Sequence, residues 1–140
     1  MQFIAAYMTV LIVFGVMDAS WLSAMGNALY RPALGDILLS NLRVGPAIAF
    51  YATFPIGVVV FAVLPALRSG SVNTAVLYGL LFGAIAYGTY DLTNYATLRN
   101  WTLQITVIDI VYGAIATAVA GAIATVVVRS LPSWIGGAAG

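Results

Sequence analysis

Residues 73–98 read NTAVLYGLLFGAIAYGTYDLTNYATL, and residues 102–128 read TLQITVIDIVYGAIATAVAGAIATVVV. Each run contains a single charged residue, Asp91 in the first and Asp109 in the second. A helix needs about 20 apolar residues, at about 1.5 Å per residue, to cross the hydrocarbon layer of a bilayer. Both runs are long enough, and only Arg99-Asn100-Trp101 separates them. They predict an antiparallel pair of membrane-spanning helices.

Two further apolar runs extend this pattern toward the N-terminus. They cover residues 2–25 and 45–67, and a polar turn, Arg68-Ser69-Gly70-Ser71, separates the second of them from residues 73–98. The first run has no Arg or Lys before it and no small-residue cleavage site after it, so we expect a retained helix instead of a signal peptide. The predicted fold is an all-α integral membrane protein, a four-transmembrane-helix bundle, with residues 1–129 as a single domain.

The composition of the whole chain agrees with a lipid environment and excludes several kinds of site. Of the 140 residues, 63% are hydrophobic and 6% are charged, whereas about 25% of a soluble domain is charged. The chain has no Cys and no His, which excludes disulfides, zinc sites of the usual kind and Ser-His-Asp triads. We expect no metal and no cofactor. The net charge of +1, without a basic run, argues against nucleic acid as a partner.

Two segments outside the four runs are expected to lie at the membrane surface. The connection over residues 26–43 is too short and too polar to span, which predicts an interfacial or re-entrant segment between the first and second helices. Residues 130–140 carry Trp134 near several glycines, which predicts an interfacial or flexible tail. The arginines are divided almost evenly between the two sides, so their count does not decide the orientation.

Three aspartates interrupt the apolar helices at similar depth. Each lies about two turns from a helix end, and the alternating helix directions place all three roughly 10–12 Å inside one leaflet. An ionised Asp at membrane depth costs about 2.5–3.5 kcal/mol, so each is expected to face the bundle interior. Helical spacing places other polar and aromatic residues on the same faces. The predicted ligand-binding or proton-binding cavity comprises Asp18, Trp21, Tyr87, Asp91, Asn94, Tyr95, Asp109 and Tyr112, with Arg31, Arg43 and Arg99 as candidate counter-ions.

Other residues have plain structural interpretations. Aromatic residues near the helix ends are typical of an interfacial belt, namely Tyr7, Tyr30, Tyr78, Trp101 and Trp134. Small residues four apart predict close contact between the third and fourth helices, namely Ala75, Gly79 and Gly83 with Gly113, Thr117 and Gly121. Pro55 predicts a kink in the second helix, because its ring clashes with the Tyr51 carbonyl.

The string Tyr90-Asp91-Leu92-Thr93-Asn94, continued through Ala96-Thr97-Leu98 to Trp101, closely resembles the signature of a bacterial family designated domain of unknown function 2177 (DUF2177). Residues 61–68, Asp18-x-x-Trp21-Leu22 and the segment from Leu29 to Gly35 resemble its other marks. Where the family pattern has Asp-x-x-Trp-Gly, this chain has Asp109-x-x-Tyr112-Gly113. The resemblance covers most of residues 1–128. It implies a multi-pass protein of four helices in the bacterial inner (cytoplasmic) membrane, and it implies no activity.

The residues leave three classes of function open. A transporter-like protein would take up a proton or an amphiphilic ligand, because three carboxyls in one chamber do not easily all ionise. A lipid-modifying enzyme would use Asp91 and Asp109 as acid and base. In a structural protein, the aspartates would make hydrogen bonds between helices and so hold them in register. The expected partners are membrane lipids, a small amphiphile or proton, and a second copy of the chain.

Overall fold

The computed structural model describes residues 1–132, so the predicted Trp134 anchor and most of the tail over residues 130–140 lie outside the described residues. The described part is helical and has no strand. Its elements are α1 (Gln2–Met25), a π-helical turn (Gly26–Tyr30), α2 (Arg31–Leu34), α3 (Val44–Val58), a second π-helical turn (Val59–Val63), α4 (Leu64–Ser69), α5 (Val72–Thr97) and α6 (Leu103–Ser130). These elements join into four continuous helices long and apolar enough to cross a membrane. The predicted fold class is confirmed.

The first helix is longer than the sequence predicted. It continues to Leu34 instead of ending at Met25, because Gly26 keeps a right-handed helical backbone and the π-helical turn leads directly into α2. Its 33 residues extend over about 50 Å, well beyond the roughly 30 Å of hydrocarbon. The segment between the first two spans therefore begins as a helical extension and continues as turns and bends over residues 35–43.

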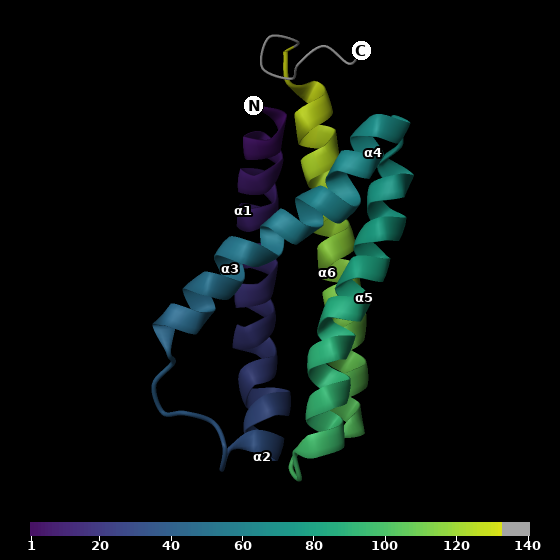
Figure 1. The fold of residues 1–140 in the computed structure, drawn as a ribbon. Coiled ribbons are helices and arrows are strands. Elements are labelled where there is room, and N and C mark those ends of the chain that lie inside the picture. The colour runs from purple at the N-terminus through teal and green to yellow at the C-terminus, as the bar shows by residue number, and fades with distance from the viewer. Residues whose placement is uncertain (133–140) are drawn as a thin grey trace.

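The four spans are packed unequally (Figure 1). α5 and α6 form the most extensive contact, and α1 packs along α6. The second span, from α3 to α4, crosses the others obliquely, with its C-terminal half on α5 and α6 and its N-terminal half beside α1. This span contains a π-helical turn, Val59–Val63, between Pro55 and Pro65. Pro55 itself lies inside α3, and the kink expected there stays a prediction.

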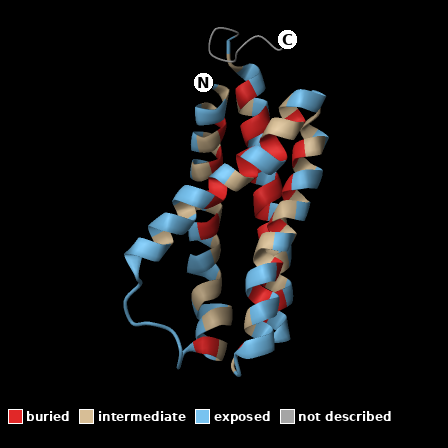
Figure 2. Ribbon diagram, in the orientation of Figure 1, coloured by how far each residue is buried: buried red, intermediate tan, exposed pale blue. Residues whose placement is uncertain are grey.

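Most of the buried apolar residues form a core at the end of the bundle that contains the N-terminus (Figure 2), and a smaller cluster of Leu34, Trp101 and Ile105 lies elsewhere. This core includes Val10 and Phe14 of α1, Val58 of the second span and Ala116 of α6, each with no exposed surface. The outer faces of the helices carry large apolar side chains instead, as expected of surfaces that contact lipid. One half of the bundle is therefore closed by apolar packing.

The predicted small-residue contact between α5 and α6 is confirmed. A Cβ atom added at Gly83 would lie 2.4 Å from the Gly113 carbonyl oxygen, and one added at Gly79 would lie 2.7 Å from the Ala118 Cα. The backbones of the two helices approach so closely that any side chain at these positions would displace the neighbouring helix.

The topology predicts which loops share a side of the membrane. Because the chain has no cysteine, a single-Cys variant at Arg31, Asn41, Asn100 or Ser69 reports the accessibility of that position alone. In sealed vesicles, a membrane-impermeant maleimide should label the first three from one side and Ser69→Cys only from the other. Labelling of Arg31→Cys and Asn41→Cys from opposite sides would contradict the arrangement.

Candidate functional site

Asp18 of α1 is hydrogen-bonded by one tyrosine from each of the other three spans. The Tyr51 hydroxyl of α3 donates to Oδ2. The hydroxyls of Tyr87 on α5 and Tyr112 on α6 lie 3.5 and 3.4 Å from Oδ1. The carboxyl is buried. Because its three donors come from α3, α5 and α6, this cluster joins all four spans at one residue.

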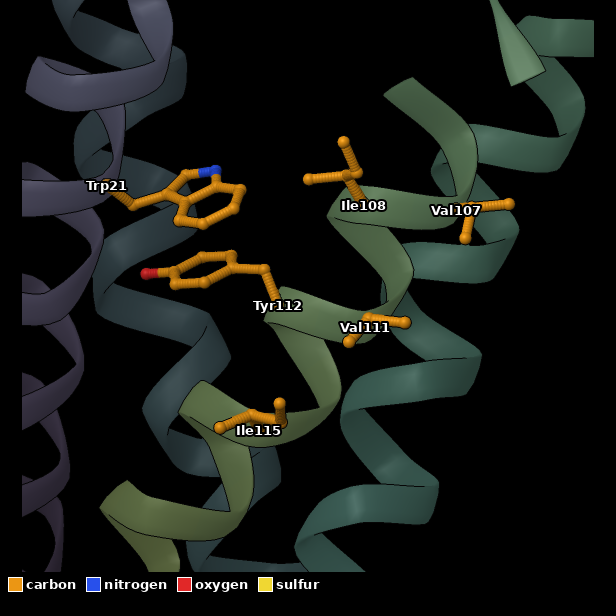
Figure 3. A pocket seen from close by; sticks show the side chains of 6 residues that line it. All are labelled: Trp21, Val107, Ile108, Val111, Tyr112 and Ile115. Carbon is orange, nitrogen blue, oxygen red and sulfur yellow. The ribbon is translucent and has the colours of Figure 1, made fainter. Parts of the chain in front are cut away.

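Asp109 of α6 is held by the far end of the first span. The Tyr30 hydroxyl donates to Asp109 Oδ1, and the Trp21 indole nitrogen donates to the Tyr30 hydroxyl over 2.9 Å. The Trp21 ring stacks on Tyr112, with ring centroids 4.1 Å apart and planes 8° apart (Figure 3). The stacked pair therefore connects the surroundings of Asp18 with those of Asp109.

Asp91 of α5 is fully buried and differs from the other two aspartates. Neither of its carboxylate oxygens has a hydrogen-bond partner among residues 1–132, and the buried indole nitrogen of Trp101 also lacks one. Asp109 and Trp101 are its polar neighbours. A buried carboxylate without a partner costs several kcal/mol of solvation free energy, so Asp91 is the least stabilised of the three carboxyls.

The structure places the remaining predicted site residues less centrally. Tyr87 bonds to Asp18 instead of Asp91, and Asn94 is half-buried. Tyr95 is 46% exposed. The candidate counter-ions Arg31, Arg43 and Arg99 are all exposed, at the ends of helices or in the first loop, and thus lie outside the buried cluster.

Three aromatic residues of the site were not predicted. The interpretation of Tyr30 and Trp101 as interfacial belt residues was wrong, since Tyr30 bonds to Asp109 and Trp101 is buried beside Asp91. Tyr51 had no predicted role in the site. One signal was present in the sequence, because Tyr30 and Trp101 both lie in the stretches that resemble the family.

An apolar pocket of about 310 Å³ lies beside the stacked rings of Trp21 and Tyr112. It is lined by Trp21, Val107, Ile108, Val111, Tyr112 and Ile115, as Figure 3 shows. Trp21 and Tyr112 thus belong both to the aspartate cluster and to this pocket. Among residues 1–132, no group of three or more acidic side chains could hold a metal ion.

Removal of the Tyr51 hydroxyl should destabilise the contact between the first two spans. Tyr51→Phe leaves Asp18 Oδ2 without its donor, and we expect the free energy of unfolding to fall by about 1–3 kcal/mol. Thermal unfolding in detergent measures the effect. Tyr78→Phe is the matched control, because Tyr78 is 48% exposed and lies nine residues before Tyr87, the α5 residue that bonds to Asp18. Equal melting temperatures for the two variants would contradict this role of Tyr51.

Comparison with known proteins gives one match. The model of a family described as predicted membrane protein (DUF2177) matches residues 3–126. Searches of curated proteins and of solved structures gave no match. The matched region contains all four spans except the last turn of α6, together with the three buried aspartates and their aromatic partners. The chain belongs to the DUF2177 family of predicted membrane proteins, and its four candidate spans make it a multi-pass membrane protein.

Proposed function

We propose that this protein is a transporter-like protein of the bacterial inner membrane that takes up a proton or a cationic amphiphile at Asp18, Asp91 and Asp109. One observation carries the proposal: three carboxyls are buried in the same half of the bundle, and the side chains that donate to Asp18 and Asp109 are tyrosines instead of arginines. Like charges in a medium of low dielectric constant repel strongly, so a proton or a ligand cation must neutralise part of the cluster.

The proposal includes a second copy of the chain. The half of the bundle opposite the aspartates is filled by apolar side chains such as Val10, Phe14 and Val58. A polar ligand has no path through that core within one copy. A translocation route across the whole membrane would therefore need a contact between two copies.

Binding of a cation should be coupled to proton release. We use dodecyltrimethylammonium as the probe, with the protein in phosphatidylcholine nanodiscs. Calorimetry in buffers of different ionisation enthalpy should show binding with release of protons, and Asp109→Asn should weaken binding about tenfold, which corresponds to about 1.4 kcal/mol. Asp36→Asn is the matched control, because Asp36 is exposed in the first loop. Equal affinity in the two variants, or binding without proton release, would contradict the proposal.

A lipid-modifying enzyme is the second candidate function. The unlike environments of Asp91 and Asp109 favour it, because two carboxyls in different surroundings can divide the roles of acid and base. Mass spectrometry of total lipids should then show a species that cells gain or lose with the wild-type protein and not with Asp109→Asn. Unchanged lipids would exclude this candidate.

A further inference from the structure

The geometry of Trp21 and Tyr112 points to the route and the class of the ligand: we infer that a single-chain amphiphile with an ammonium headgroup enters from the bilayer, between α1 and α6, with its chain in the apolar pocket. This inference rests on the proposed function and deepens it. It concerns a site that the family resemblance does not assign.

The pocket opens toward the lipid. Val107 and Val111 are each 52% exposed and Ile115 is 50% exposed, on a face of α6 that contacts hydrocarbon in a bilayer. Its volume of about 310 Å³ is at the lower end of the range of about 300–1,000 Å³ for ligand pockets. A pocket of this size and lining suits one flexible alkyl chain better than a two-chain lipid.

The stacked rings form the wall between this pocket and the carboxyls. The rings of Trp21 and Tyr112 line the pocket, whereas the Trp21 indole nitrogen and the Tyr112 hydroxyl make hydrogen bonds in the aspartate cluster. The Tyr112 hydroxyl lies 3.4 Å from Asp18 Oδ1, and the Trp21 indole nitrogen lies 2.9 Å from the Tyr30 hydroxyl that donates to Asp109. Figure 3 shows the Tyr112 hydroxyl pointing away from Val107 and Val111. Movement of one ring would connect the hydrocarbon with the carboxyls.

The chemistry of the cluster selects the headgroup. Carboxyls attract a cation and repel phosphate or sulfonate groups. Aromatic rings surround these carboxyls, since Trp21 stacks on Tyr112 and Tyr87 lies edge-on to Tyr112. Asp91 adds a third carboxyl beside Asp109, and both of its oxygens are fully buried without a hydrogen-bond partner among the described residues.

Photolabelling tests the route. The probe is dodecyltrimethylammonium with a diazirine in its alkyl chain, added to the protein in phosphatidylcholine nanodiscs, and labelled peptides are mapped by mass spectrometry. We expect labelling within residues 107–115, and we expect Val111→Trp, which fills the pocket, to reduce it about tenfold. Val126→Trp is the matched control, because Val126 is lipid-facing on α6 outside the pocket and 53% exposed. Ile115→Phe is a second filling variant, and the melting temperature verifies that each variant is folded.

A probe with a different headgroup distinguishes this inference from ordinary lipid contact. The position of the label distinguishes it from the proposed function. Equal labelling of residues 107–115 by the dodecyl sulfonate analogue, or labelling unchanged by Asp109→Asn, would overturn the inference. If the ammonium probe binds with proton release but labels a different segment, the proposed function stands and the lateral route is wrong. Loss of labelling in Val111→Trp and in Asp109→Asn, but not in Val126→Trp, would support the route.

Discussion

Asp91→Asn should abolish the binding of dodecyltrimethylammonium while the protein still inserts and keeps its melting temperature. Asn is nearly isosteric with Asp and retains hydrogen-bonding capacity, but it carries no negative charge and takes up no proton. Asp91 makes no hydrogen bond with residues 1–132, so the substitution removes no bond that holds these residues together. We expect no measurable binding in nanodiscs by the same calorimetry, a larger effect than the loss of about tenfold expected for Asp109→Asn.

A second substitution at this position separates charge from packing. Asp91→Leu should also abolish binding, and its melting temperature should equal or exceed that of the wild type, because an unpartnered buried carboxyl is destabilising. Asp18→Leu should lower the melting temperature, since three tyrosine hydroxyls would lose their acceptor. If Asp91→Leu lowers the melting temperature and Asp91→Asn binds the probe normally, Asp91 serves only helix packing. The functional interpretation of this residue is then wrong.

Gly83→Ala should strongly destabilise the bundle. The added Cβ would lie 2.4 Å from the Gly113 carbonyl oxygen and 2.7 Å from Thr117 Oγ1, so α5 and α6 would have to move apart. Since Thr117 Oγ1 also donates to the Gly113 carbonyl over 2.6 Å, the local backbone has little freedom to adjust. We expect the free energy of unfolding to fall by about 1–3 kcal/mol, as for other overpacked sites. Thermal or denaturant unfolding in detergent measures this loss.

The control for Gly83 is the same substitution on α1. A Cβ added at Gly15 has no atom within 4 Å, and Ala favours a helix by roughly 0.5–1 kcal/mol over Gly. Gly15→Ala should therefore leave stability unchanged or increase it. Equal destabilisation by the two substitutions would show that the close approach of α5 and α6 is not the cause.

The sequence by itself determined the number of spans and most of their approximate ends. These properties follow from local quantities: the length of each apolar run, the scarcity of charge and the rise per residue of a helix. The turns before α5 and α6 were placed correctly because Gly70 and the Arg99-Asn100-Trp101 segment interrupt those runs. Only the end of the first helix was misplaced, because a glycine that remains helical looks the same in sequence as one that ends a helix. The predicted distance of Asp18 from the end of its helix, about two turns, was too short, because that helix continues to Leu34.

Only the tertiary structure decided which polar groups meet. Spacing along α5 placed Tyr87 with Asp91, yet Tyr87 bonds to Asp18 on another helix, and the Asp109 partner, Tyr30, lies on the extension of the first helix. Helical periodicity specifies the face on which a side chain lies, but the rotation and tilt of each helix depend on the packing of all four. The oblique second span and the glycine contact between α5 and α6 set those angles. Residues far apart in the chain therefore become partners through packing geometry, which no single helix encodes.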